Sequence, residues 1–230
     1  MYNKTNLYLL FLLIILLFLC GCSPNNTLQS NASNIDNNNT INTTNKITNT
    51  SAKQPENNKI LDEKLQSLIE LAKTYKGKQG NLLSENKIDL GGTNGYIVVF
   101  TPYFEVTLDA LKNIQNYQDY NLENAKNKYY ETKDIFAICC FLYSNEPDFI
   151  KNPTTVIKIG NKIIHPTDSS GQQFSNTSEY FPDPAYIGGC ISYFNISDLG
   201  DVKNFQFAIV INGKETNFDI DLSKIKFNEF

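Results

Sequence analysis

Residues 205–223, FQFAIVINGKETNFDIDLS, carry the clearest β-hairpin pattern of this 230-residue chain. Apolar and polar side chains alternate on both sides of the pair Asn212-Gly213. Asn-Gly favours a two-residue turn, because both turn positions require a positive φ. The residues expected on the buried face are Phe205, Phe207, Ile209 and Ile211 before the turn, and Phe218, Ile220 and Leu222 after it. The pattern predicts two antiparallel strands.

Other strand-like runs, rich in β-branched and aromatic residues, precede this hairpin. They are GYIVVF (95–100), FEVTL (104–108), DIFAICCFLY (134–143), GGCISYF (188–194) and TTVIKIGNKIIHP (154–166), in which Gly160-Asn161 is a second candidate turn. About seven strands without interleaved helices predict a mainly β fold, a two-sheet sandwich over residues 90–230. Segment 113–128 is long for a strand connection, and a short helix is expected there at residues 122–128.

A helical pattern lies upstream of the strands. Its apolar residues recur at the spacing of one helix face, and they are Leu61, Leu65, Leu68, Ile69 and Ala72. We expect a short amphipathic helix over residues 59–77 that buries this face against the sandwich. The alternative is a stalk helix that self-associates or lies on the membrane, although the sustained heptads of a coiled coil are lacking.

The segment before the helix has the composition of a disordered chain. Residues 25–59 contain twelve Asn and six Thr but no aromatic residue. Such a segment cannot bury enough apolar surface to offset the entropy lost on ordering. Residues 22–58 are therefore expected to form a disordered tether.

The first residues have the pattern of an export signal. Residues 7–19 are almost entirely apolar and follow one basic residue, Lys4. This run is shorter than the about 20 residues that span a bilayer, and a charged start with a short apolar run is typical of a signal peptide. Its end, Leu19-Cys20-Gly21-Cys22, resembles the lipobox of bacterial lipoproteins.

That resemblance implies a signal peptide over residues 1–21 and lipid attachment at Cys22. The diacylglyceryl group and an added palmitate would hold the mature protein on the extracytoplasmic face of the cell membrane, since two or more acyl chains anchor stably. The membrane is thus an expected partner.

The order of features after the signal peptide also resembles that of a known class of domains. A polar tether, strand pairs, a strand buried on both faces and a terminal hairpin resemble the immunoglobulin-like domains, some called telokin-like, of small bacterial lipoproteins. The resemblance implies an immunoglobulin-like sandwich preceded by the short helix. The Cys…Trp…Cys pattern of antibody domains is missing, because the sequence has no Trp.

The charges and side-chain types argue against several functions. All 20 basic residues are Lys, and removal of Lys4 leaves 19 against 24 acidic residues, a net charge of −5. Nucleic-acid recognition usually relies on Arg, so no nucleic acid is expected as a partner. Zinc sites need clustered Cys and His. The single histidine, His165, is expected on the surface at a strand end, and no metal or other cofactor is expected.

Three cysteines remain after Cys22, at positions 139, 140 and 190. Neighbouring strand residues point to opposite faces, so only one of Cys139 and Cys140 can face the core. If Cys140 does, it could form a disulfide with Cys190 that closes a loop of about 50 residues and stabilises the fold by roughly 4 kcal/mol. We expect instead that the cysteines are buried free thiols, which behave as small apolar side chains.

The segment 169–189 contains the candidate binding loop. Four aromatic residues stand among Gly, Ser, Asn and Pro there, a composition used for protein or sugar contact; they are Phe174, Tyr180, Phe181 and Tyr186. Alternatively, Phe181 and Tyr186 pack into the core and the rest is a polar crossover.

The sequence contains no recognisable catalytic motif, so we expect a protein that is not an enzyme. Its expected role is binding or structural support at the cell envelope, with a protein or carbohydrate ligand. One alternative is a hydrolase of envelope polymers that uses dispersed carboxylates, whose spacing in the chain says nothing about their distance in space. The other is an accessory subunit of a membrane complex.

Overall fold

The computed structural model describes residues 54–91, 94–167 and 174–229. The expected signal peptide, Cys22 and the tether up to residue 53 lie outside the described residues. Residues Ile60–Phe230 belong to one unit of the chain. Among the described residues, no helix combines the length and the apolar character that crossing a membrane requires.

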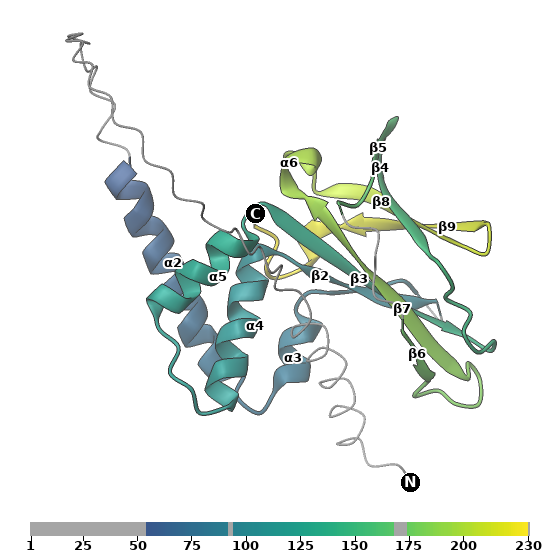
Figure 1. The fold of residues 1–230 in the computed structure, drawn as a ribbon, viewed down its shortest axis with the longest axis horizontal. Coiled ribbons are helices and arrows are strands. Elements are labelled where there is room, and N and C mark those ends of the chain that lie inside the picture. The colour runs from purple at the N-terminus through teal and green to yellow at the C-terminus, as the bar shows by residue number, and fades with distance from the viewer. Residues whose placement is uncertain (1–53, 92–93, 168–173, 230) are drawn as a thin grey trace, which may run out of the picture. The chain divides into compact units, whose positions relative to one another are not determined.

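The nine strands of the described residues form two antiparallel sheets (Figure 1). Sheet A has the order β1-β2-β3-β7-β6 and consists of β1 (Lys87–Asp89), β2 (Gly95–Phe100), β3 (Ile135–Ser144), β6 (Phe174–Thr177) and β7 (Tyr186–Asn195). Sheet B has the order β5-β4-β8-β9 and consists of β4 (Thr154–Ile159), β5 (Lys162–Ile164), β8 (Asn204–Ile211) and β9 (Lys214–Asp221). The mainly β, two-sheet class expected from the sequence is confirmed.

Both predicted two-residue turns are present. Asn212 and Gly213, with φ of 52° and 76°, join β8 to β9, where Ile211 lies opposite Lys214. Gly160, with φ of 56°, joins β4 to β5 together with Asn161. Gly adopts a positive φ without steric cost and Asn tolerates it, so these residues set the register of both hairpins.

The inner faces of the two sheets share one apolar core. Its members come from both sheets and include Phe136, Ile138, Cys140, Leu142, Cys190 and Phe194 from sheet A and Ile157, Phe207, Ile209 and Ile220 from sheet B. Cys140 thus faces the core, as the alternation along β3 allows. Cys139 is also buried but lies outside this core cluster, because the next residue of a strand points to the opposite face.

The strand predicted at residues 104–108 is wrong, because those residues belong to helix α4 (Pro102–Gln115). The Thr101 hydroxyl caps this helix by accepting a hydrogen bond from the Phe104 N–H at 3.4 Å. Pro102 takes the first helical position, where its missing N–H costs nothing. Phe104, Leu108 and Leu111 are buried and recur at the spacing of a helix face.

A second helix, α5 (Leu122–Thr132), follows α4 before β3. The short helix expected at residues 122–128 is therefore confirmed and continues by four residues. Asn121 and Asn124 form reciprocal hydrogen bonds at its start. Because α4 and α5 both stand between β2 and β3, the expectation of a sandwich without interleaved helices is wrong.

Two further helices precede the sheets in the chain. Helix α2 (Gln54–Thr74) begins inside the range expected for the tether, and Leu65, Leu68, Ile69 and Ala72 of its apolar stripe are buried. Its Asp62 forms an ion pair with Lys126 of α5 at 2.9 Å. Helix α3 (Gln79–Ser84) is short. In Figure 1 the helices α2 to α5 gather on one side of the sheets. A single turn, α6 (Ile196–Leu199), follows β7.

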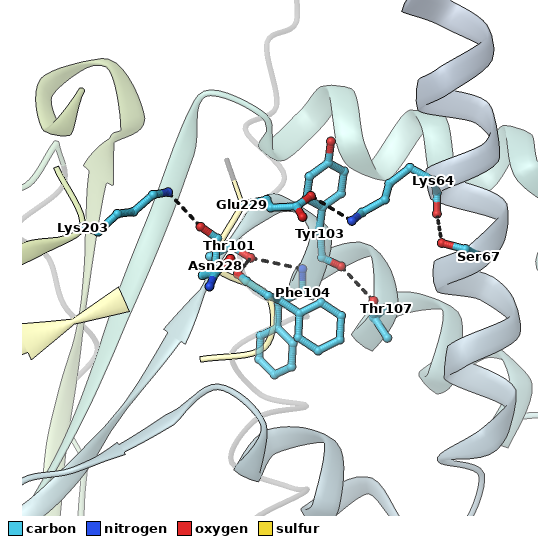
Figure 2. Close-up of polar contacts among 10 residues, drawn as sticks. Lys64, Ser67, Thr101, Tyr103, Phe104, Thr107, Lys203, Asn228 and Glu229 are labelled. Carbon is cyan, nitrogen blue, oxygen red and sulfur yellow. Dashed lines mark hydrogen bonds and ion pairs between the residues drawn. The ribbon is translucent and has the colours of Figure 1, made fainter. Parts of the chain in front are cut away.

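The residues after the 3-10 turn η1 (Leu222–Lys224) connect the helices to sheet A (Figure 2). The Thr101 hydroxyl donates to the Phe227 carbonyl at 2.8 Å. The Phe227 N–H donates to Oδ1 of the fully buried Asn86 at 3.1 Å, and Nδ2 of Asn86 donates to the Val99 carbonyl of β2 at 2.8 Å. One buried amide side chain thus joins β2 to the C-terminal segment 225–229.

Further contacts hold the same segment. Lys203 Nζ donates to the Asn228 carbonyl at 2.9 Å, and Lys64 of α2 forms an ion pair with Glu229 at 2.8 Å. The rings of Phe227 and Phe104 of α4 pack with their centroids 5.2 Å apart. The segment therefore contacts helices α2 and α4 and residues that directly adjoin strands β1, β2 and β8.

Candidate functional site

Residues 169–173 of the candidate binding segment lie outside the described residues, and two strands take up part of the rest. Residues Phe174–Thr177 form β6 and Tyr186 begins β7. Residues 178–185 remain, and we name them the aromatic loop. Tyr180 is 55% exposed and Phe181 is 64% exposed. The alternative that places Phe181 in the core is therefore wrong.

Hydrogen bonds from the end of β3 hold the aromatic loop in place. Asn145 Nδ2 donates to Asp183 Oδ1 at 2.8 Å, and Asn145 Oδ1 accepts from the Ala185 N–H at 2.8 Å. Inside the loop, the buried Ser178 accepts at Oγ from the Tyr180 N–H at 3.0 Å. The two exposed rings therefore belong to a loop with a fixed backbone.

Tyr143 of β3 packs against the aromatic loop. The ring of Tyr143 meets Tyr180 edge to face at 5.2 Å, and its hydroxyl donates to Glu179 Oε1 at 2.5 Å. Burial, together with the Glu179 carboxylate, raises the pKa of Tyr143, so its phenol stays protonated and remains a donor. Tyr96 and Phe141 stack at 4.6 Å in the neighbouring strands.

The other two predicted residues lie on the adjoining strands. Phe174 is opposite Gly189 in the β6–β7 pairing, and its side chain lies outside the described part of the structure. Tyr186 is half-buried at the start of β7. The sequence did not reveal the supporting contacts of Tyr143 and Asn145, because these join residues 36 to 40 positions apart.

A hollow of about 260 Å³ lies where β7 faces the start of β4. The exposed His165, just after β5, lines it together with Cys190. The hydroxyls of Thr155 and Ser192, both buried, are 2.6 Å apart in its wall and join sheet A to sheet B. The contacts found among the described residues include none between His165 and Ser192 or Cys190, so no nucleophile–base hydrogen bond is formed here.

The three cysteines of the domain are free and buried. Cys140 lies directly opposite Cys190 in the β3–β7 pairing. Burial raises the pKa of Cys190 to about 12, and that of Cys140 well above its usual value. Because the thiolate is the reactive form, both groups are unreactive near neutral pH. Free thiols at all three positions stay a prediction, and thiol titration tests it against a Cys140–Cys190 disulfide.

A partly buried carboxyl group, that of Glu105, lies among the helices. Glu105 of α4 lies 3.6 Å from Lys128 of α5, and both side chains are 19% exposed. Burial raises the pKa of Glu105, an effect that Lys128 opposes. In the described part of the chain, no group of three or more His, Cys, Asp and Glu side chains could hold a metal ion.

No protein-family model matches the chain, and no curated protein matches it.

Proposed function

We propose that this protein is a lipid-anchored component of the cell envelope that binds a protein or carbohydrate and catalyses no reaction. The N-terminal segment supports the location, because its lipobox-like end places Cys22 for acylation. The aromatic loop supports the binding role. Tyr180 and Phe181 expose more than half of their surface on a loop that Asn145 and Ser178 hold by hydrogen bonds.

That pair of exposed rings carries the proposal. Burying a large apolar side chain is favourable by roughly 1.5–3 kcal/mol, so a ligand that covers two rings gains substantial affinity. The fixed backbone adds to this, because a loop already in its bound shape pays little ordering entropy when the ligand binds.

The location is tested by labelling cells that express the full chain with radioactive palmitate. The wild type and Cys20→Ser should incorporate label and sediment with membranes, whereas Cys22→Ser should do neither. Cys20→Ser is the matched control, since it removes the neighbouring thiol only. An unlabelled wild type, or a labelled Cys22→Ser variant, would refute the anchor.

The binding role is tested with isolated cell envelopes of the producing organism as the probe. The chain from residue 22 onward, carrying Cys22→Ser, is mixed with the envelopes and sedimented. Tyr180→Ala with Phe181→Ala should weaken association at least about tenfold, as loss of aromatic anchors commonly does. Tyr117→Ala is the control, because Tyr117 is 88% exposed and lies between α4 and α5. Equal binding of all three proteins would exclude the aromatic loop as the contact surface.

The two other candidate functions give different outcomes. Protease treatment of the envelopes should abolish sedimentation if the protein is an accessory subunit of a membrane complex, and should leave it intact if the ligand is carbohydrate. A polymer hydrolase would need two carboxyl groups about 5–10 Å apart in a cleft. The partly buried carboxyl of Glu105 forms an ion pair with Lys128, which also pairs with Glu131.

We further propose that the sandwich is immunoglobulin-like. The chain passes between sheets A and B at the β3–β4, β5–β6 and β7–β8 connections, which is in keeping with such domains. The insertion of α4 and α5 between β2 and β3 is a departure from the usual pattern, in which loops join the strands.

A further inference from the structure

Strand β9 has one neighbour, β8, and forms an edge of sheet B (Figure 1). The Leu222 N–H donates to the Lys203 carbonyl at 2.8 Å and continues the β8–β9 pairing. Alternate residues of an antiparallel strand point their backbone groups to the same side. Positions 214, 216, 218 and 220 therefore face β8, and Glu215, Asn217, Asp219 and Asp221 face away from it.

The outward backbone groups of Glu215, Asn217 and Asp219 are open to a partner. The hydrogen bonds found among the described residues include none from the backbone N–H or C=O of Glu215, Asn217 or Asp219 to a neighbour on this side. The residues from 214 to 217 and Asp219 are exposed. An edge of eight residues with free donors and acceptors can pair with another extended chain.

The side chains along this edge are acidic. Ile220 belongs to the core and Phe218 packs against it, so the alternating residues Glu215, Asp219 and Asp221 lie on the outer face. Lys158, two strands away, pairs with Glu215 at 2.6 Å. The carboxylates nearer the end of β9 are hydrogen-bonded by neutral donors, Asp219 by Gln206 at 3.1 Å and Asp221 by Ser223.

This charge pattern disfavours a second copy of the chain as the added strand. Only residues with outward backbone groups can pair across the edge, so an antiparallel β9–β9 contact must place odd-numbered positions opposite each other. In the registers that pair most of the strand, Glu215 would then face Asp221 or Asp219 of the other copy. Like charges directly opposite in a sheet are destabilising, and a strand with cations at alternate positions is favoured instead.

We propose that the free edge of β9 binds an extended segment of a partner protein that carries Lys or Arg at alternate positions. The segment would add a fifth strand to sheet B, with main-chain hydrogen bonds to Asn217 and Asp219 and cationic side chains beside Asp219 and Asp221. A shallow hollow of about 380 Å³ borders these two carboxylates, and Lys158 and Lys224 line it as well. This surface is separate from the aromatic loop, which adjoins sheet A.

The probe is a fluorescent, end-blocked heptapeptide of alternating residues, Lys-Val-Lys-Thr-Lys-Val-Lys, titrated against the full chain in detergent. It should bind, and the same peptide with Glu in place of Lys should bind at least about tenfold more weakly. Raising the salt concentration should weaken binding of the Lys peptide, because salt screens its charges. Amide exchange of Asn217 and Asp219 should slow in the complex. Equal binding of both peptides would contradict the proposed preference for cationic side chains.

Variants of β9 separate backbone pairing from charge. Asn217→Pro removes an outward N–H and no β8–β9 hydrogen bond, and it should lower affinity at least about tenfold. Asn217→Ala, which keeps the N–H, is the matched control and should bind within about twofold of wild type.

Asp219→Lys leaves the backbone pairing of β9 unchanged, so it tests the site even if Asn217→Pro fails to fold. The Asp219→Lys protein should bind the Glu peptide better than the Lys peptide. Binding unaffected by both Asn217→Pro and Asp219→Lys would refute the site. The Tyr180→Ala, Phe181→Ala protein should bind the Lys peptide like wild type, so this test does not depend on the proposed function.

Discussion

The hydroxyl pair of Thr155 and Ser192 shows how single residues hold the two sheets together. Both side chains are buried and lie 2.6 Å apart across the sandwich. Ser192→Ala should lower the free energy of unfolding by about 1–3 kcal/mol, because it leaves the Thr155 hydroxyl buried without that partner. The double variant Thr155→Val, Ser192→Ala should have a free energy of unfolding closer to that of the wild type than Ser192→Ala alone has. Urea unfolding measures this, and a double variant that loses the sum of both single losses would contradict it.

Thiol titration tests whether the three cysteines are free. Protein purified from membranes and denatured without reductant should show three free thiols, from Cys139, Cys140 and Cys190, and two after Cys139→Ala. The folded protein should react slowly, because burial raises the pKa of Cys190 to about 12. One free thiol in the denatured wild type would mean that Cys140 and Cys190 are joined.

Glu105 should make stability depend on pH. Burial raises the pKa of Glu105 above its ordinary 4.5, so the folded protein holds this proton more tightly than the unfolded chain does. The resulting stability is fully present below about pH 4.5 and is lost as the pH rises through the folded pKa. Glu105→Gln should remove this decline. Parallel stability profiles of the two proteins in urea unfolding at several pH values would contradict the expectation.

At the scale of elements, the sequence predicted what local chemistry determines. The alternation of Phe205, Phe207 and Ile209 and the two turns containing Gly and Asn were sufficient for β4, β5, β8 and β9. Residues 104–108 of helix α4 resemble a strand in sequence, because Val106 and Thr107 are β-branched and Phe104 is aromatic. Thr101-Pro102, a capping residue followed by the residue preferred at the first helical position, was the overlooked signal.

The candidate site was predictable only in part for a related reason. Tyr180 and Phe181 stand out by composition, because their neighbours are polar or turn-forming. Their supports, Tyr143 and Asn145, are set by the pairing of β3 with β7, a long-range register that no local pattern contains. The same applies to β1 and β6, which are too short to show a period.

The α4 cap itself is testable. Thr101→Ala should lower the free energy of unfolding by about 1–2 kcal/mol, because the helix loses its N-cap and the Phe227 carbonyl loses a donor at 2.8 Å. Thr101→Ser keeps the hydroxyl and should recover most of the loss. Thermal unfolding followed by circular dichroism compares the three proteins, and equal losses for Ala and Ser would exclude the hydroxyl as the cause.

Segment 225–229 contacts both the helices and residues next to the sheets, so we expect it to make helices and sheets unfold together. Phe227 is 6% exposed and packs on Phe104, and Phe227→Ala should lower stability by about 3–5 kcal/mol. Glu229→Ala, which removes an exposed ion pair with Lys64, should change it by no more than about 1 kcal/mol. Urea unfolding followed by helix and tyrosine signals measures both, and separate transitions for helices and sheets in the wild type would contradict the coupling.

The bond between Phe227 and Asn86 also has a consequence for the order in which the protein is made. The two residues are 141 positions apart, and a chain emerges from the ribosome with its amino end first. Oδ1 of Asn86 therefore cannot form this bond until nearly all of this domain has been synthesised. The native environment of Asn86 should accordingly be completed only after residue 227 has been synthesised, so this part of the domain cannot reach its final packing early in translation.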